Sequence, residues 1–529
     1  MRRRSFLKTA AAATAAAPFM VGGLPARANT SLAALAQMPP DNDRILVVIQ
    51  LFGGNDGLNT MPPCHDDEYY RIRPALAIAK DKAWNNIGDI YLHPALATGS
   101  RGGMGRMLEI GTLAIVQGVG YPNPNLSHFR STDIWLSGIN NSNPDTRLDT
   151  GWVGRYLEQR YPDFPASLPP DPLAIQFGGF SLALISSKGR MGIEVIDPTQ
   201  LQGVASQLDE LDPDSANTSY SLEYQFVADI ANRSNKYAQS VRDAYNNGKS
   251  KLDATYADDS LSQQMASVAA LIAGGLKTKV YVVSMGGFDT HVSQQIAVGD
   301  EYVGLHPTLL SRIGDSVAQF MHDMTRLGLA DRVIGMTISE FGRRPYENGS
   351  RGTDHGAASV QFVFGTQVNS GVFGDPPDLK NLNANGDLQY QIDYRAVYAE
   401  ILTDWFGMTM PEMRTVLQDE TVIPLDILQA QKSGTDRRAE YADGSFSIAG
   451  AYPNPFRTTT TLQISIDRAA HVQLDLSTMA GQRVATLLDR RVSPGKYQIP
   501  LTAELPAGTY LCTLRDGQRI ATQVVRCVR

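Results

Sequence analysis

The sequence predicts an α/β protein with a mainly parallel sheet covered by helices on both faces, followed by a small all-β sandwich at the C-terminus. Two nearly continuous apolar runs, 44–52 (RILVVIQLF) and 279–285 (KVYVVSM), are typical of strands buried on both faces of a sheet. Apolar residues at helical spacing over 308–327 predict a helix that leads to the next strand. Beyond residue 447 the runs become short and alternating, with Gly and Pro turns between them, which indicates antiparallel strands.

The other elements follow from the same patterns. Strands are expected over 112–119, 333–338 and 359–365, helices over 265–276 and 393–407, a helix start with a Pro-rich connection over 149–172, and a polar insertion or cap over 200–255. These elements predict an α/β domain over 44–430, a linker over 431–447 and a sandwich over 448–529.

Composition limits the classes of function. Apolar residues make up 43% of the chain and charged residues 19%, which is typical of a soluble globular protein. The net charge of −7 and the absence of a basic stripe with interleaved aromatics make nucleic acid an unexpected partner. The three cysteines are too few to form a disulfide framework; Cys512 and Cys527 are candidates for one bridge, whereas Cys64 is expected to stay single.

The first 28 residues have the pattern of an export signal. Arg2 to Arg4 precede the run SFLK, a small apolar segment follows to about Gly23, and Ala26-Arg27-Ala28 offers a cleavage site. This segment resembles a twin-arginine signal peptide and implies the twin-arginine translocase as a partner. The competing interpretation is a membrane anchor, but the apolar segment is shorter than the ~20 residues that a span needs. We expect a mature chain from near Asn29 without a transmembrane anchor.

Polar side chains follow four of the predicted strands, each just past the strand's C-terminal end. They are Asp56 after 44–52, Ser127 after 112–119, Asp289 and His291 after 279–285, and Glu340 after 333–338, with Asp354 and His355 further along the same Gly-rich loop. Parallel strands place their carboxyl ends at one edge of a sheet, so these groups are expected to converge. Carboxylate and imidazole groups together are typical metal ligands, and the pattern therefore predicts a metal site.

Ser127 is a candidate nucleophile at this edge. Its neighbour His128 is an unfavourable base for a serine triad, because adjacent side chains diverge, and the chain has no G-x-S-x-G motif. Activation by a metal is the better hypothesis. The candidates to hold the charge of an oxyanion are Arg343, Arg130 and Arg344. The alternatives are a helix N-cap for Ser127 and an ordinary turn residue for Asp56.

The C-terminal region carries motifs of its own. The opening 451–456 (AYPNPF), the turn 479–481 (MAG) and the segment 506–510 (PAGTY) resemble the C-terminal sorting domain of type IX secretion cargo. This resemblance implies the type IX secretion machinery as a partner. A carbohydrate-binding or adhesion module is the alternative, but no exposed aromatic platform supports it.

The segment 45–406 resembles the bacterial family known as domain of unknown function 1501. The motifs that carry the resemblance are 53–59 (GGNDGLN), 127–129 (SHF), 151–155 (GWVGR), 287–291 (GFDTH), 339–343 (SEFGR) and 352–356 (GTDHG). That family is grouped with the alkaline-phosphatase-like superfamily, which includes sulfatases. The resemblance therefore implies an alkaline-phosphatase-like fold and one or two divalent metal ions, with zinc or manganese the leading candidates.

Residue by residue, the resemblance implies particular roles. Asp56 is similar to the first-strand metal ligand, Ser127 to the nucleophile, Asp289 and His291 to one metal's ligand pair, Glu340 to the aspartate of an Asp-His pair, and His355 to the late histidine. The sequence departs from the superfamily at Phe341, where a second ligand is usual, because phenylalanine cannot bind a cation. One metal site is then expected to be weakened, to be single, or to have a different ligand, for which Asp354 and His128 are the candidates.

These observations lead to three hypotheses. The first is an exported metal-dependent hydrolase of phosphate or sulfate esters, acting on a small-molecule or glycan ester, that passes through the periplasm to the cell surface or beyond. The second is an inactive, surface-displayed binding or structural protein with a relic metal site, which Phe341 favours. The third, a metal-free serine hydrolase, is disfavoured because no base is evident near Ser127.

Overall fold

The structure is a computed structural model that describes residues 19–21, 24–26, 42–179, 181–199, 237–296, 300–429 and 446–528, the last with short gaps at 453, 455, 457–458, 467–469, 480–481, 493–494, 503–504 and 518. The arginines of the expected signal peptide, most of the expected insertion and nearly all of the expected linker lie outside the described residues. Among the helices that the structure describes, none is both long and apolar enough to cross a membrane.

A large sheet forms the centre of the α/β domain. Within the described residues it has nine strands, in the order β10-β7-β11-β3-β12-β15-β6-β16, with β17 also paired to β6. Their bounds are β3 Ile45–Leu51, β6 Leu113–Gly120, β7 Ala174–Phe177, β10 Ile193–Val195, β11 Val280–Met285, β12 Val333–Ser339, β15 Ser359–Phe364, β16 Gly371–Phe373 and β17 Ile392–Asp393. The strands expected from apolar runs are thus all present.

Strand direction brings four carboxyl ends to one edge. β3 pairs in parallel with β11 on one side and β12 on the other, with Val48 level with Val282 and Met336. β15 is antiparallel to both β12 and β6, so β6 runs in the same direction as β12. The sheet is therefore mainly parallel, and the ends of β3, β6, β11 and β12 point the same way.

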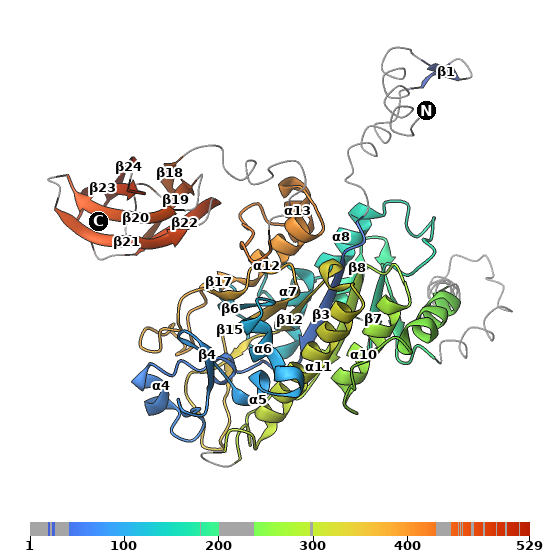
Figure 1. Cartoon of the computed structure of the whole chain (residues 1–529). Helices are drawn as coiled ribbons and strands as arrows, with labels where there is room; N and C mark the ends of the chain where they lie inside the picture. The colour runs from blue at the N-terminus through green and yellow to red at the C-terminus, as the bar shows by residue number, and fades with distance from the viewer. Residues whose placement is uncertain are drawn as a thin grey trace.

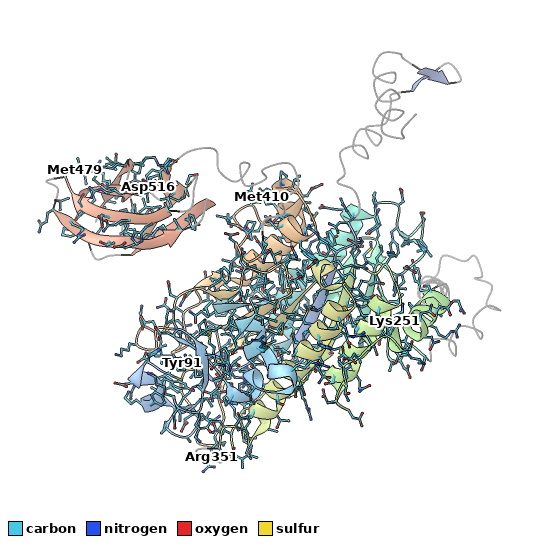
Figure 2. All side chains as sticks on the ribbon, in the orientation of Figure 1. Tyr91, Lys251, Arg351, Met410, Met479 and Asp516 are labelled. Atoms are coloured by element: carbon cyan, nitrogen blue, oxygen red, sulfur yellow. The ribbon has the colours of Figure 1, made fainter. Side chains whose placement is uncertain are left out.

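The sheet has an apolar core on each face, which explains its uninterrupted apolar runs. Ile45, Val47 and Ile49 belong to one core and Leu46 and Val48 to the other, because successive side chains of a strand point to opposite faces. The first core is covered by α5 Pro94–Ala97, α6 Gly103–Glu109, α10 Ser260–Ala273 and α11 Leu305–Arg326. The second is covered by α7 His128–Ser137, α8 Trp152–Arg160, α12 Tyr394–Glu400 and α13 Met410–Leu417. Figure 1 shows the helices around the sheet, and Figure 2 adds the side chains in the same orientation.

Several helices differ in extent from the sequence expectation. α10 begins at Ser260, five residues earlier than expected, because Asp259 caps it by accepting hydrogen bonds from the backbone N–H groups of Leu261 and Ser262. α12 is capped by Asp393 and continues as the π-helix Ile401–Trp405. Within the expected insertion, residues 237–249 are helical.

Short elements complete the domain. They are α3 Gly57–Thr60, α4 Asp67–Ile72, the pair β4 Trp84–Ile87 and β5 Ile90–Leu92, the 3-10 turns Ser100–Gly102, Leu182–Leu184 and Ala330–Arg332, the pair β8 Ile185–Ser186 and β9 Gly189–Arg190, and the hairpin β13 Gly342–Arg343 with β14 His355–Gly356. A further pair, β1 Phe19–Val21 and β2 Leu24–Ala26, precedes the domain.

The C-terminal region is an all-antiparallel β structure with a core of its own (Figure 1). One sheet has the order β18-β19-β22 and the other β21-β20-β23-β24. The bounds are β18 Ser447–Tyr452, β19 Thr459–Ile466, β20 Ala470–Thr478, β21 Arg483–Val492, β22 Gly495–Thr502, β23 Gly508–Arg515 and β24 Ile520–Cys527. Cys512 and Cys527 are not joined by a disulfide, because the strand register places Cys512 opposite Gln523 and Cys527 opposite Gly508. The bridge considered from sequence is therefore not formed, and Cys64 is not in a disulfide either.

Candidate metal centre

Two loops that follow neighbouring parallel strands bring the candidate residues together. The loop after β11 carries Asp289 and His291, and the loop after β12 returns through β14, which begins at His355. The backbone N–H of Thr353 donates to the carbonyl oxygen of Thr290 at 3.1 Å, which joins the two loops directly. Residues 64 positions apart in the chain thus share one site.

Four side chains converge at this edge of the sheet. His291 Nε2 and His355 Nε2 lie 3.1 Å apart, and Asp289 Oδ1 lies 3.1 Å from the first and 3.2 Å from the second. His128, the first residue of α7, places its Nε2 3.5 Å from Asp289 Oδ2. Donor atoms of His128, Asp289 and His355 all lie within 4.8 Å of one another. The structure therefore contains a His/Asp cluster of metal-ligand residue types.

The hydrogen bonds of His355 and His291 show which ring nitrogen carries the proton. His355 Nδ1 lies 2.9 Å from the carbonyl oxygen of Leu126, which can only accept, so Nδ1 is the protonated atom. His291 Nδ1 lies 2.9 Å from Asp354 Oδ1 and donates to that carboxylate. In the neutral rings, both Nε2 atoms therefore present lone pairs toward Asp289, as metal-ligating histidines do.

Electrostatics favour the metal-binding protonation states at neutral pH. Burial raises the pKa of Asp289, but the hydrogen bond from Arg343 and the positive charge of its guanidinium outweigh burial and hold this pKa at about 2. The hydrogen bond with His291 is the main reason that the pKa of Asp354 is lowered. Burial also lowers the pKa of His355 from its ordinary value. Both carboxyl groups are thus ionised at pH 7 while His355 is neutral.

The donor atoms fit a divalent cation. Ligands at ~2.0–2.1 Å from a tetrahedral zinc ion lie roughly 3.3 Å apart, and the three spacings among Asp289, His291 and His355 are 3.1, 3.1 and 3.2 Å. Two lone pairs and a carboxylate oxygen at these spacings form a site whose electrostatics suit a cation.

Glu340 and Phe341 contact the histidines of the cluster but are not among its four converging side chains. Glu340 is buried, and its Oε1 accepts from the backbone N–H of Gly53 at 2.7 Å and from His128 Nδ1 at 2.9 Å. The ring of Phe341 packs against His355 and His128, with centroids 4.3 and 4.9 Å away. Glu340 therefore orients His128, and Phe341 forms an apolar wall behind two of the imidazoles.

Asp56 lies outside the cluster, in a buried ion pair. Arg73 Nη1 donates to Asp56 Oδ2 at 2.6 Å, and both side chains are fully buried. Gln294 Nε2 donates to the same oxygen at 2.5 Å, while Asp56 Oδ1 caps α3 by accepting from the N–H groups of Leu58 and Asn59. Burial raises the pKa of Asp56, but the positive charge of Arg73 and the hydrogen bonds from Arg73 and Gln294 outweigh it and lower this pKa. Its oxygens are thus already occupied by protein donors.

Ser127 lies at the rim of the cluster. It precedes α7 in the N-cap position, yet its side chain makes no capping hydrogen bond. The residue is exposed, and among the described residues its hydroxyl has no hydrogen-bond partner. Its neighbours on each side both contact the cluster: the carbonyl of Leu126 holds His355, and His128 is a cluster member.

Arg343 is a buried organiser of the site. Its guanidinium donates to the carbonyl oxygens of Gly54 at 2.9 Å, Thr353 at 2.7 Å and Phe288 at 2.9 Å, and Nη2 also donates to Asp289 Oδ1 at 2.7 Å. It therefore links the loops after β3, β11 and β12 and fixes the Asp289 carboxylate.

The other two candidate arginines contact other loops. Arg130 donates to the carbonyl oxygens of Asn141 at 2.9 Å and Thr146 at 2.7 Å, which holds the loop after α7. Arg344 Nε lies 3.3 Å from a carboxylate oxygen of the buried Asp387. In this arrangement neither guanidinium contacts the four cluster side chains.

Sequence reasoning did not single out two residues that organise this edge, Arg73 and Gln294. Both are fully buried polar residues that hold Asp56. Arg73 follows a short helix in an ordinary-looking stretch, and Gln294 lies three residues after His291. The closeness of Gln294 to the motif 287–291 was the one local signal in the sequence that could have found it.

Comparisons with solved structures give only distant matches. A protein in the alkaline phosphatase superfamily from Vibrio parahaemolyticus is 7% identical, with 100% of this chain and 91% of that chain covered and a TM-score of 0.31. The PsFucS1 sulfatase from Pseudoalteromonas sp. is 8% identical over 87% and 84% of the chains, with a TM-score of 0.33. The lipoteichoic acid synthase LtaP from Listeria monocytogenes is 10% identical over 73% and 76%, with a TM-score of 0.29. Similarity this low does not identify an activity, and the comparison with curated proteins gives no match.

Family profiles match both parts of the chain. Residues 450–526 match the secretion system C-terminal sorting domain, which directs export to the cell surface or the extracellular space. Residues 149–419, which include α8, the strand β11, the cluster residues of both loops and α12, match the family described as "Protein of unknown function (DUF1501)". Because this match covers more than half of the chain, the protein belongs to the DUF1501 family.

Proposed function

We propose that this protein is an exported, metal-dependent hydrolase of phosphate or sulfate esters in which Ser127 is the nucleophile. The observation that carries the proposal is the triangle of donor atoms from Asp289, His291 and His355, with spacings of 3.1, 3.1 and 3.2 Å, beside an exposed serine. The resemblance of the site motifs to the alkaline-phosphatase-like superfamily also supports it.

The metal site consists of Asp289, His291 and His355, with His128 as a fourth donor. When bound, a divalent cation lowers the pKa of a nearby hydroxyl and offsets negative charge on the ester oxygens. The second carboxylate, Asp354, keeps His291 in the ligating tautomer, and Glu340 does the same for His128. Zinc and manganese are the leading candidates for the ion.

In this proposal Ser127 attacks an ester held at the cluster. Its hydroxyl is exposed and free of hydrogen bonds within the described residues, so no bond to protein must break first. In the reaction its Oγ forms a bond to phosphorus or sulfur, the alcohol leaves with a proton, and water then hydrolyses the ester formed on Ser127. Arg343 contributes by holding the Asp289 carboxylate in position. Its N–H groups donate to backbone carbonyl oxygens and to that carboxylate.

The test uses the mature chain loaded with Zn²⁺ or Mn²⁺ and two chromogenic esters, p-nitrophenyl phosphate and p-nitrophenyl sulfate. Ser127→Ala is expected to retain the bound metal and lose at least 100-fold in turnover, because it removes only the nucleophile. Asp289→Ala is expected to lose both metal and turnover. Undiminished turnover in a metal-free Asp289→Ala variant would contradict the proposal.

The second candidate function is a surface-displayed binding or structural protein that retains a metal site. Phe341 favours it, because an apolar ring lies where the superfamily usually has a ligand. The same experiment separates the two: stoichiometric metal in wild type without turnover of either ester, and no change on Ser127→Ala, would support the binding protein.

A further inference from the structure

We propose that Gln294 is a positioning residue that sets the spacing between the two loops carrying the metal ligands. The inference rests on the proposed metal centre, and it assigns a role to a side chain that contacts neither the cation nor the ester. Gln294 is fully buried and lies three residues beyond His291.

Its amide joins three groups that belong to three separate loops. Gln294 Oε1 accepts from the hydroxyl of Thr290 at 2.9 Å and from the hydroxyl of Thr353 at 2.7 Å. Gln294 Nε2 donates to Asp56 Oδ2 at 2.5 Å. Because hydroxyls can donate and a carboxylate can only accept, these partners also establish which end of the amide is oxygen.

The two threonines flank the ligands. Thr290 stands between Asp289 and His291, and Thr353 immediately precedes Asp354 and His355. Both threonine side chains are fully buried. The amide oxygen of Gln294 thus accepts from one threonine hydroxyl in each of the two ligand-bearing segments and links them.

The third partner, Asp56, connects this pair of loops to its buried ion pair with Arg73, which we call the anchor. Arg73 neutralises Asp56 and also donates to Asn59 Oδ1 and to the carbonyl oxygens of Arg344 and Pro345, each at 2.7 Å. The anchor therefore ties the loop after β3 to the loop after β12. Through Gln294 the same anchor reaches the loop after β11.

Loss of this amide is expected to weaken metal binding, because the ligands on the two loops can then move relative to each other. Without it, two buried hydroxyls and one carboxylate oxygen lose a partner, and the two segments can shift relative to each other. Groups that orient metal ligands without binding the ion typically contribute 10–100-fold to affinity. The donor spacings near 3 Å between His291 and His355 depend on both segments at once.

The experiment measures Co²⁺ and Zn²⁺ affinity of the full mature chain by chelator competition, together with the Co²⁺ absorption spectrum. Gln294→Leu and Thr353→Val are expected to lower affinity by about 10–100-fold and to alter the Co²⁺ spectrum. Thr353→Ser, which keeps the hydroxyl, is expected to restore wild-type affinity. Gln361→Leu is the matched control, because Gln361 is also a buried glutamine, on β15, and its amide oxygen has no hydrogen-bond partner. This variant is expected to bind Co²⁺ as wild type does.

A double-mutant cycle tests the connection itself. Thr290→Val and Gln294→Leu break the same hydrogen bond, so their combined effect on affinity is expected to be smaller than the sum of the single effects. Should Gln294→Leu fail to fold, the isosteric Thr290→Val and Thr353→Val variants carry the test.

The outcomes distinguish this inference from the proposed function. Wild type that binds neither Co²⁺ nor Zn²⁺ overturns the metal centre and with it both proposals. Wild type that binds metal, with unchanged affinity and spectrum in both Thr353→Val and Gln294→Leu, overturns only the role of Gln294.

Discussion

His93 and His306 are two fully buried imidazoles near the ion pair of Asp56 and Arg73. His306 Nε2 lies 3.0 Å from Asn55 Oδ1, and the two rings meet edge to face with centroids 6.1 Å apart. His93 Nδ1 accepts from the backbone N–H of Ala95 and so caps α5. Burial lowers the pKa of His93 to about 3 and that of His306 to about 4. Both are therefore neutral in the folded protein at pH 7.

These two histidines predict acid sensitivity. Their pKa values are lower in the folded than in the unfolded chain, where a histidine titrates near 6.5, so the unfolded chain binds more protons below that pH. The contribution of the two histidines to the free energy of unfolding is thus fully present above about pH 6.5. It is lost as the pH falls toward 4 and 3. By pH 4.5 each histidine is expected to remove roughly 2–3 kcal/mol from the free energy of unfolding.

Urea titrations of metal-free protein between pH 7.5 and 4.5 measure this loss. His306→Asn is expected to be less stable at pH 7.5 but to lose less on acidification, since it cannot be protonated. A free energy of unfolding that stays level from pH 6.5 to 4.5 in wild type would show that the imidazoles are not held neutral by the fold.

At the scale of single residues, the sequence located the chemistry but not each role. Asp289, His291 and His355 were identified from their place after strands, and they do converge. Asp56 shares that place, yet its oxygens are taken by Arg73 and Gln294. No local pattern distinguishes these cases, because a carboxylate's role depends on partners far away in the chain.

The loop between β13 and β14 shows how an element can set the geometry of a site. This loop passes directly behind His291: Asn348 Nδ2 donates to the His291 carbonyl at 2.9 Å. A Cβ at Gly352 would collide with the same carbonyl oxygen, so the close approach of the two loops depends on that glycine. A Cβ at Gly349, three residues earlier, would meet nothing within 4 Å.

These two glycines form a matched pair for mutation. Gly352→Ala is expected to push the two ligand loops apart and to lower Co²⁺ affinity by at least 10-fold, whereas Gly349→Ala is expected to leave affinity within about 2-fold of wild type. Chelator competition measures both, and thermal unfolding shows whether each variant remains folded. Equal affinities in the two variants would mean that loop spacing does not control the metal site.

At the scale of elements, strand positions were predictable and strand directions were not. The run 44–52 matches β3 Ile45–Leu51, and 359–365 matches β15 Ser359–Phe364. β15 is antiparallel to both of its neighbours, which its apolar run does not indicate, because hydrophobic burial is the same in either direction. Direction is set by the connecting loops and the pairing partners.

The whole molecule has separate apolar cores in its two parts. In the portion of the chain that the structure describes, the cores of the α/β domain draw no residue from beyond Leu428, and the core of the C-terminal strands begins at Ile448. Each part therefore buries its own apolar surface. The His/Asp cluster lies entirely in the first part, and the sorting domain is the second.

This separation predicts that location and metal binding can be changed independently. Arg3→Lys/Arg4→Lys in the full chain is expected to keep the protein in the cytoplasm, and a chain ending at Gln429 is expected to stop in the periplasm. Purified Gln429-terminated protein is expected to bind Co²⁺ with wild-type affinity. Cell fractionation and chelator competition check the two parts.

Surface display of the truncated chain would show that the sorting domain is dispensable, and export of the double-lysine variant would show that another signal is used. Loss of Co²⁺ binding on truncation, in a protein that remains folded, would show that the sorting domain contributes to the metal site.

The sequence alone determined the α/β class, the C-terminal sorting domain and the edge of the sheet at which the polar residues meet. Those properties depend on periodicity, on contiguous motifs and on the common direction of parallel strands, all of which are local or nearly so. Only the tertiary structure decided that His128 joins the cluster, that Arg73 neutralises Asp56, and that Gln294 connects three loops. Each of these is a contact between residues distant in sequence, and which buried polar groups find one another is decided by packing rather than by pattern.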